Sequence, residues 1–506
     1  MSAVTVLASL LADRSPVPGH RPWPRHAVEA AAWRAASAAL GDGRLVLLSL
    51  WAEPEAVHMA LRDGGDVVVL SLACPEGGFP SVGAHHAPAI RLERAIHDLY
   101  GLVPVDAPDD RAWLDHGRWG CLRPLAATSP PLLAPAAAAA YRFLPAEGPG
   151  LHQIPVGPVH AGIIEPGHFR FTASGETVVR LEERLGYVHK GIDGLTTDAD
   201  IATAARLAGR TSGDSTVAYA LAFARAVEAA TGSEPPPRAV WLRALMAEIE
   251  RVANHLGDIG AICNDAAFAL MHAHTAVLRE RVLRFAGTAF GHRLMMDRVI
   301  PGGVAADLSP AAATGLAALL DEIRTTFPRL VALYDSTASL LDRTVGTGRL
   351  DPALAARFAP GGTIGRAAGQ AFDVRRDLPY APYEALDFDV PVLGEGDVNA
   401  RVWIRIREVE QSLGLIAEIA ARLPEGPIAA LLAAGRGEGM ALVESFRGPV
   451  LAWVRLGGGG RVLRCHLRDP SWFQWPLLEA VIEGNIVADF PLCNKSFNCS
   501  YSGHDL

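Results

Sequence analysis

Two polar, glycine-bearing stretches of the sequence carry residues that could do chemistry. The first is 210–215 (RTSGDS), which opens an apolar helical pattern, and the second is the last thirteen residues, 494–506. Each lies beside a long hydrophobic element, where a buried site could form. Serine and aspartate side chains at a helix start commonly cap free backbone N–H groups, and alternatively they could line a polar cavity that holds water, protons or a quinone headgroup.

The six cysteines are scattered and form no Cys-x-x-Cys pair, which argues against a zinc site and against a disulfide framework. This pattern fits a reducing cytoplasm. The formal net charge of −9 gives no electrostatic reason to expect binding to nucleic acid or to an anionic membrane surface. The sequence shows no secretory signal and no membrane-spanning run, so we expect a protein that is peripheral to any membrane.

The elements that must position these stretches fall into two predicted domains. Residues 1–123 combine a helix signal at 26–40 with β-type runs at 44–51 and 66–72, and they end in an amphipathic helix at 91–101, which predicts an α+β module. Residues 124–150 are rich in proline and alanine and are predicted to be an inter-domain linker.

Residues 151–506 predict a mostly α-helical domain with small β elements. An alternating pattern around Ser174 and Gly175 indicates a β-hairpin, and a long core helix is expected after the prolines at 235–237. Further helices are predicted at 273–285, 310–342 and 397–422, and strand-like alternation returns at 443–466.

Several passages of residues 157–506 together resemble one family, the large subunits of membrane-bound, energy-converting nickel–iron hydrogenases and the equivalent quinone-site subunit of respiratory complex I. Residues 93–119 resemble the end of that family's small hydrophilic partner subunit in complex I. The chain therefore resembles a fusion of the two, as in hydrogenases of formate-oxidising complexes. The passages are GPVHAGIIEPGHFRF (157–171), GETVVRLEERLGYVHKGIDGL (175–195), PPRAVWLRALMAEIERVANHLGDIG (236–260), GHRLMMDRVIPGGV (291–304), AAGQAFDVRRDLPYAPYEALDFDVP (367–391), VESFRGPV (443–450) and ADFPLCNKSFN (488–498).

In the hydrogenases that the chain resembles, two Cys-x-x-Cys pairs hold the nickel and iron. The resemblance places the first pair on Ser212 and Ser215 and the second on Ser500 and Gly503. Serine hydroxyls are hard, weakly acidic ligands and glycine offers none, so four soft anionic donors are missing together. We therefore expect no nickel–iron centre, and no metal bound by this chain.

Other site-like residues of the family are present. Glu165 matches the glutamate that takes protons from the metal site in the hydrogenases, and a half-buried carboxylate there would suit proton relay. Arg447 matches the arginine over the open metal position, and Arg210 matches the start of the first ligand motif. Buried arginines usually pair with a carboxylate, and Asp214 is the obvious candidate.

His160 resembles the first histidine of the loop that reaches the quinone in complex I, and His168 is a second candidate for the pocket or the quinone. The spacing after His160 follows the hydrogenase form, however. The tyrosine that complex I uses has no evident counterpart before Arg210. Isolated histidines such as His168 are also common as hydrogen-bonding core residues.

The resemblance implies a nickel-free subunit of a membrane-bound redox or ion-translocating complex, on the cytoplasmic side of the inner membrane. Its expected partners are a small iron–sulfur subunit, which would hold the cluster, and membrane-embedded antiporter-like subunits. Two alternatives remain open: a quinone-reducing subunit like that of complex I, and a scaffold without chemistry of its own. A working hydrogenase component is opposed by the missing cysteines.

Overall fold

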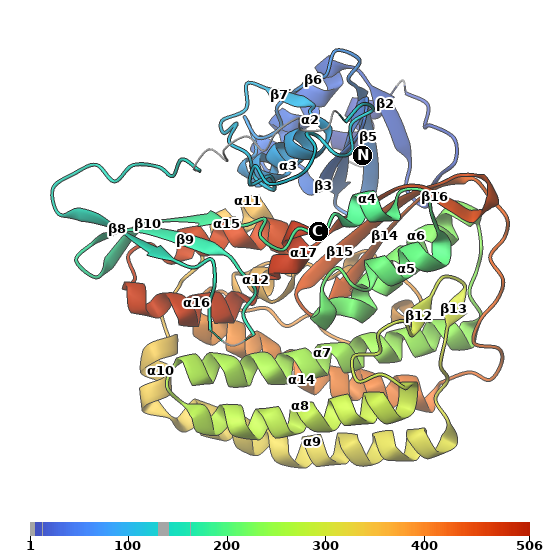
Figure 1. Cartoon of the computed structure of the whole chain (residues 1–506). Coiled ribbons are helices and arrows are strands. Elements are labelled where there is room, and N and C mark those ends of the chain that lie inside the picture. The colour runs from blue at the N-terminus through green and yellow to red at the C-terminus, as the bar shows by residue number, and fades with distance from the viewer. Residues whose placement is uncertain (1–5, 13, 130–140, 162) are drawn as a thin grey trace, which may run out of the picture.

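The computed structural model describes residues 6–12, 14–129, 141–161 and 163–506. An α/β region comes first in the chain and lies at the top of Figure 1, above a larger, helix-rich region. The elements of the first region are α1 (Val6–Leu11), β1 (His20–Arg21), β2 (Arg25–Val28), α2 (Ala30–Gly41), β3 (Val46–Glu53), β4 (Ala56–Asp63), β5 (Asp66–Ala73), β6 (Gly78–Pro80), η1 (Ala87–Ala89), α3 (Ile90–Tyr100) and β7 (Val103–Val105).

The N-terminal sheet has the strand order β2-β5-β4-β3, in which β2 runs parallel to β5 and the other neighbours are antiparallel. Valines and leucines of β3 to β5 are almost fully buried, as their β-branched and apolar pattern predicts. The helix predicted at 26–40 begins later, at Ala30, because residues 25–28 pair with β5 instead. The predicted helix at 91–101 is confirmed, and Gly101 ends it with a φ of 75°.

The larger region carries the remaining elements, and the predicted fold class, an α+β module followed by a mostly helical domain, is confirmed. They are β8 (Leu151–Val156), β9 (His168–Ser174), β10 (Thr177–Arg184), α4 (Ile192–Thr196), β11 (Ala199–Asp200), α5 (Ile201–Ala208), η2 (Gly213–Ser215), α6 (Thr216–Thr231), α7 (Pro237–Asp265), α8 (Ala269–Phe290), β12 (Val299–Ile300), β13 (Gly303–Val304), α9 (Pro310–Ser336), α10 (Ala338–Thr344), α11 (Pro352–Phe358), α12 (Gly362–Ala367), α13 (Val374–Asp377), η3 (Tyr383–Ala385), α14 (Val398–Ala421), β14 (Gly437–Ser445), β15 (Gly448–Leu456), η4 (Gly458–Gly460), β16 (Arg461–Arg468), α15 (Ser471–Val481), η5 (Val487–Asp489), α16 (Phe490–Phe497) and α17 (Tyr501–Asp505).

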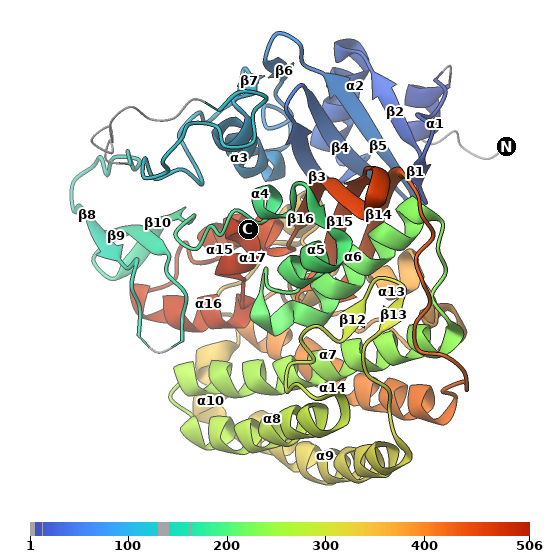
Figure 2. The ribbon, with the colours of Figure 1, turned by 45° about the vertical axis from the view of Figure 1, so that its right-hand side comes forward.

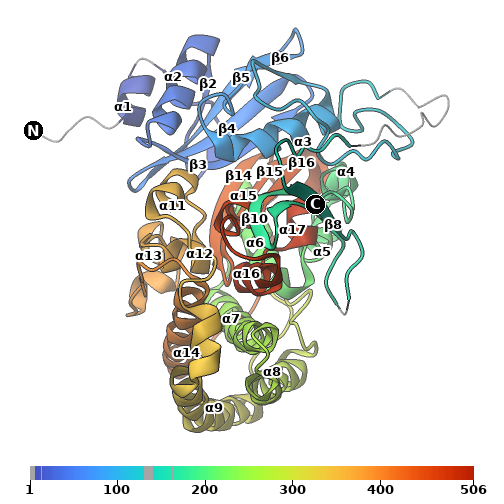
Figure 3. The same ribbon diagram turned by 90° about the vertical axis from the view of Figure 1, so that its left-hand side faces the viewer.

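Helices α7, α8, α9 and α14 lie side by side at the end of the molecule remote from the N-terminal region (Figures 1 and 3). Helix α7 is the long core helix expected behind the prolines, and it starts with Pro237, whose missing N–H costs nothing at a first helical position. The helix predicted at 310–342 is two helices, because Thr337 is extended and its hydroxyl bonds the backbone oxygen of Leu333 at 2.6 Å.

A second sheet, with strand order β1-β14-β15-β16-β11, lies between the helices and the N-terminal region, and α6 packs on β14 and β15 (Figure 2). The hairpin predicted around Ser174 and Gly175 is confirmed as β9–β10.

The two predicted domains share this sheet, since β1 pairs with β14 and Arg25 contacts Glu438 at 2.8 Å. The boundaries 1–123, 124–150 and 151–506 remain a prediction, because residues 130–140 lie outside the described part of the chain.

Candidate functional site

A cavity of about 320 Å³ lies where four distant segments meet: the loop before β9, the 3-10 turn η2, the turn between β14 and β15, and the C-terminal helices α16 and α17. Its walls carry most of the polar residues that the sequence analysis singled out, together with residues that it did not foresee. The lining residues are Ile163, Ile164, Glu165, Ser212, Gly213, Asp214, Arg447, Asn494, Lys495, Asn498, Cys499, Ser500, Tyr501 and Ser502.

A tight turn positions Arg447 at this cavity. Ser445 pairs with Gly448 at the end of the β14–β15 ladder, so only two residues connect the strands. The Ser445 hydroxyl donates to the backbone oxygen of Gly448 at 2.8 Å, and Gly448 adopts a φ of 134° that an L-residue rarely takes. The guanidinium of Arg447 is thereby held over η2, where its Nη1 donates to the Ser215 hydroxyl at 2.9 Å.

Arg447 and Asp214 form a bidentate ion pair at the cavity wall, which confirms the predicted pairing of these residues. The Nη1 of Arg447 lies 2.9 Å from Oδ1 of Asp214, and its Nη2 contacts Oδ2. Burial opposes ionisation of Asp214, but the charge of Arg447 and the hydrogen bonds from neighbouring serines outweigh it and lower the pKa to about 2. Asp214 therefore stays ionised at neutral pH.

Three hydroxyl and backbone groups form a chain of hydrogen bonds that ends on Asp214. The Ser212 hydroxyl donates to Oδ1 of Asp214 at 2.8 Å and lies 2.9 Å from the Ser500 hydroxyl. Because the Ser212 proton is engaged, Ser500 is the donor between the two serines. The backbone N–H of Gly503 donates to Ser500 at 2.9 Å. Ser212 and Ser500 are thus bonded to each other and to neighbouring groups.

The helix that follows these residues is capped by another element. Neither Ser212 nor Ser215 makes a side-chain cap at the start of η2 or α6. The expectation that these side chains cap the free backbone N–H groups of the helix is therefore wrong. Instead, Glu250 of α7 accepts from the backbone N–H groups of Val217 at 2.7 Å and Ala218 at 3.1 Å. This cap leaves the serines and Asp214 free to face the cavity.

Glu165 also lines the cavity. It is half-buried, and its Oε2 accepts from the backbone N–H of Ser502, at the start of α17, at 3.0 Å. The structure therefore brings Glu165, Asp214 and Arg447 to one cavity, although the first lies 337 residues from its partner Ser502.

Three predicted site residues lie elsewhere. Arg210 is on the surface and forms an ion pair with Asp297 at 2.7 Å, because Asp214 is already engaged by Arg447. His160 bonds the backbone oxygen of Gly167 at 2.7 Å, which closes its own loop. His168 contacts the backbone oxygen of Gly157 at 3.3 Å and lines a different cavity, and burial lowers its pKa. The polar residues of the first cavity do not include any of the three.

Gly503 has a neighbour that the sequence did not reveal. A Cβ atom added at Gly503 would lie 2.4 Å from Oδ2 of Asp469, far inside van der Waals contact. Asp469 is fully buried and held in place, since it accepts from the Tyr219 hydroxyl at 2.7 Å and from the backbone N–H of Ser471 at 2.8 Å. A carboxylate thus fills the space that a side chain at 503 would need.

The donor set of this cavity does not fit a nickel–iron centre. Its serines are hard donors, and position 503 has neither a side chain nor room for one. Two cysteines lie near, but burial raises the pKa of Cys493 to about 12 and that of Cys499 well above its ordinary value, so both remain neutral thiols. Within the described ranges, no group of three or more His, Cys, Asp or Glu side chains is arranged to hold a metal ion.

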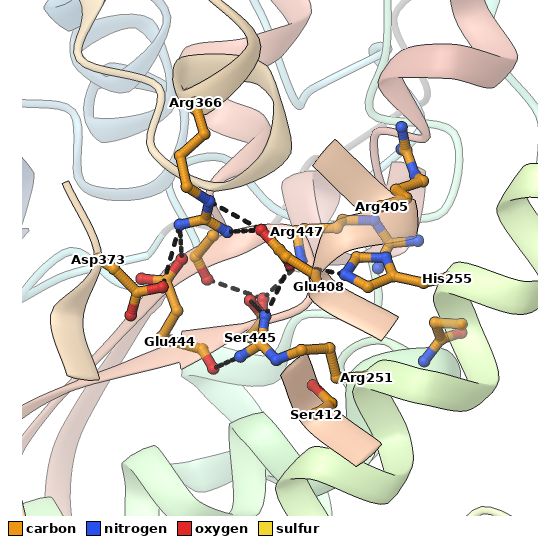
Figure 4. A network of polar contacts seen from close by, with 12 residues as sticks. Arg251, His255, Arg366, Asp373, Arg405, Glu408, Ser412, Glu444, Ser445 and Arg447 are labelled. Atoms are coloured by element: carbon orange, nitrogen blue, oxygen red, sulfur yellow. Dashed lines mark hydrogen bonds and ion pairs between the residues drawn. The ribbon is translucent and has the colours of Figure 1, made fainter. Parts of the chain in front are cut away.

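A network of buried charges lies behind the cavity (Figure 4). Arg366 contacts Glu408 at 2.7 Å, Glu444 at 2.9 Å and Asp373 at 3.2 Å. His255 adds a contact of 2.7 Å from its Nε2 to Glu408. Burial, reinforced by the nearby charge of Asp373, raises the pKa of Glu444 to about 7, although Arg366 opposes this.

The sequence analysis missed this network, although α7 carried a signal for it. Glu248, Arg251 and His255 recur at helical spacing on the long core helix, and all are at most 1% exposed. Buried charged residues at such spacing must find partners on neighbouring elements. Those partners come from α14 and β14, including Glu408.

No helix in the part of the chain that the structure describes is long and apolar enough to cross a membrane.

Comparisons with known proteins place these observations in a family. The model of the family described as "Respiratory-chain NADH dehydrogenase, 49 Kd subunit" matches residues 265–435 and 430–505. Formate hydrogenlyase subunit 5 of Escherichia coli (strain K12) is 32% identical, over 84% of this chain and 77% of the relative. The carbon monoxide-induced hydrogenase of Rhodospirillum rubrum is 31% identical, over 69% of this chain and 97% of the relative. An NADH-quinone oxidoreductase subunit of Roseiflexus sp. (strain RS-1) is 32% identical, over 67% of this chain and 94% of the relative.

A solved structure shares both fold and sequence with this chain. It is a chain of the membrane-bound sulfane sulfur reductase, described as an archaeal respiratory membrane complex, with a TM-score of 0.67 and 27% identity over 71% of this chain and 99% of that chain. These curated relatives match at more than 30% identity over most of their own length. The chain is a member of the family of the 49-kDa subunit of respiratory-chain NADH dehydrogenase.

Proposed function

We propose that this chain is a peripheral subunit of a membrane-bound redox or ion-translocating complex, on the cytoplasmic side of the inner membrane. The relatives support this role, since they are hydrogenase and NADH-quinone oxidoreductase subunits and a chain of a respiratory membrane complex. In this proposal a small partner subunit holds the iron–sulfur cluster, and membrane-embedded antiporter-like subunits carry the ions. This chain contributes a polar cavity that handles protons and does no nickel chemistry.

The observation that carries the proposal is the set of polar groups around the cavity. A volume of about 320 Å³ has room for several water molecules, and most of its lining side chains carry polar groups that can bond water. Glu165 and Asp214, whose side chain is 37% exposed, both line this volume. Water between such groups can pass protons from one to the other.

The two carboxylates have different roles in this proposal. Asp214 is held ionised by Arg447, whose own pKa the pair raises above its ordinary value, so this pair is a fixed dipole. Glu165 has no arginine or lysine in an ion pair among the described residues, and its Oε2 accepts a hydrogen bond from the backbone N–H of Ser502. Glu165 is therefore the cavity group that we assign to proton relay.

The test replaces Glu165 with glutamine in the assembled complex. Glu165→Gln keeps the size and the acceptor for the Ser502 N–H but removes the exchangeable proton, so we expect loss of coupled activity with normal assembly. Glu176→Gln is the matched control, because Glu176 is exposed at the turn of the neighbouring β9–β10 hairpin. Activity that stays near the unmodified level in Glu165→Gln would favour the scaffold alternative.

The quinone alternative has less support from the geometry. Its two histidine candidates, His160 and His168, are engaged by backbone oxygens outside the cavity. A quinone headgroup in the cavity would have to bind to the serines and Arg447 instead. Photolabelling of the complex by an azidoquinone distinguishes quinone binding from proton relay alone. Labelling within 212–215 or 494–502 supports quinone binding and overturns the proposal that the cavity handles only protons.

A further inference from the structure

A second cavity, of about 530 Å³, lies between the N-terminal region and the β9–β10 hairpin, away from the cavity described above. Its walls are rich in positive and aromatic side chains, including Arg111, Arg142, Arg184 and Tyr141, and Asp115 is the one carboxylate among its lining residues. Such a wall favours a negatively charged occupant.

Arg184 is a buried cation without an acidic partner. It is 2% exposed, and its Nη1 and Nη2 donate to the backbone oxygens of Trp113 and Asp115, the latter at 2.9 Å. Its Nε has no hydrogen-bond partner, and no carboxylate of the described residues forms an ion pair with it. Residues 130–140 contain no acidic residue that could supply one.

Two neighbouring arginines have acidic partners of the kind that Arg184 lacks. Arg111 contacts Glu182 at 2.5 Å and Asp109 at 2.7 Å, and Arg91 contacts Glu183 at 3.0 Å. Burying a charge is costly unless it is paired, and among these three arginines Arg184 lacks an ion pair. Burial accordingly lowers the pKa of Arg184.

Aromatic rings compensate only part of this cost. The guanidinium carbon of Arg184 lies 4.5 Å from the ring centre of Tyr141, and such a cation–π contact is weaker than a buried ion pair. The charge of Arg184 also lowers the pKa of the neighbouring His116, where burial has the larger effect. Three arginines and one aspartate line the cavity, so its charged lining residues carry a net positive charge.

We propose that this cavity binds a small oxyanion, either a phosphate or a carboxylate group, with Arg184 at its base. The Arg184 guanidinium lies in the cavity wall and supplies a positive charge there. Arg142 lies at the exposed rim without an ion pair among the described residues and supplies a second charge. A bound anion would give Arg184 the negatively charged partner that it lacks among the described residues.

The test measures anion binding to the full chain. Inorganic phosphate and malonate are each titrated against sodium chloride at constant ionic strength, and binding is followed by calorimetry and by the thermal unfolding midpoint. We expect saturable binding of at least one of the two anions, with a dissociation constant on the order of 1 mM or tighter, for a small oxyanion on two arginines. The anion that binds identifies the class of ligand.

Three variants test which arginines bind the anion. Arg142→Gln, at an exposed position that the fold does not need, should weaken binding about threefold or more, and Arg184→Gln should abolish it. Arg329→Gln makes the same charge change on the exposed face of α9 and should bind as the parent chain does. The proposal is overturned if neither anion binds saturably, or if Arg142→Gln and Arg329→Gln bind equally well. An Arg184→Gln chain that does not fold leaves Arg142→Gln to decide.

Discussion

The contact between Gly503 and Asp469 allows a quantitative test of why this cavity cannot be a metal site. A Cβ added by Gly503→Ala would lie 2.4 Å from Oδ2 of Asp469 and 2.8 Å from the Ser500 hydroxyl. Asp469 cannot move away cheaply, because Tyr219 and Ser471 both donate to it. Either the helix α17 shifts or these hydrogen bonds break.

The expected cost follows from these contacts. Inserting a methyl group into a packed site costs about 1–3 kcal/mol, and a buried carboxylate oxygen that loses its donor adds a similar amount. The better helix propensity of alanine returns at most about 1 kcal/mol. We therefore expect Gly503→Ala to lower the free energy of unfolding by about 1–5 kcal/mol.

Chemical denaturation followed by tryptophan fluorescence measures this change. Trp475 reports on the site directly, since its Nε1 donates to the backbone oxygen of Ser500 at 3.2 Å. Gly213→Ala is the control, because it lines the same cavity but an added Cβ there meets no atom within 4 Å. We expect the Gly213→Ala change to stay within about 0.5 kcal/mol.

The result that refutes this reasoning is a Gly503→Ala protein as stable as the parent or as Gly213→Ala. A second check is the double variant Gly503→Ala/Asp469→Ala, in which the clash is gone. Its loss of stability should be smaller than the sum of the two single losses. The same clash implies that the side chain of a cysteine introduced at position 503 would not fit while Asp469 is present.

Three further predictions concern other parts of the chain. Burial raises the pKa of Asp193 to about 7, so the folded state binds this proton more tightly than the unfolded state, and stability contributed by the group falls as pH rises from about 4 to about 7. Asp193→Asn should therefore leave the free energy of unfolding unchanged at pH 4 and raise it by roughly 2–4 kcal/mol at pH 8. Urea denaturation measures both values, and equal effects at the two pH values would contradict this prediction. Metal analysis of the purified chain should find no stoichiometric nickel, and about one nickel per chain would overturn the expected loss of the centre. Limited proteolysis should cut first within 124–150, and the fragments should co-elute in gel filtration because β1 pairs with β14; a cleavage pattern without that boundary would show that the domain division is wrong.

The sequence by itself determined the features that local pattern encodes. Helical periodicity located α7, alternation located the β9–β10 hairpin, and the chemistry of Ser212 and Ser500 excluded soft metal ligands. The predictions of α7 and of the hairpin are confirmed, because each depends on residues within a few positions of one another. The absence of a soft-ligand metal centre stays a prediction from side-chain type alone. The family resemblance added Glu165 and Arg447, and the structure brings both to one cavity.

Only the tertiary structure decided which polar groups pair. In the sequence, both Arg210 and Arg447 are candidate partners of Asp214. In the structure Asp214 pairs with Arg447, 233 residues away, and Arg210 lies on the surface and pairs with Asp297. Asp469 beside Gly503 and the unpaired Arg184 could not be read from any local motif. Pairing between distant residues depends on how strands and helices pack, and buried charges take whichever partner the packing brings within reach.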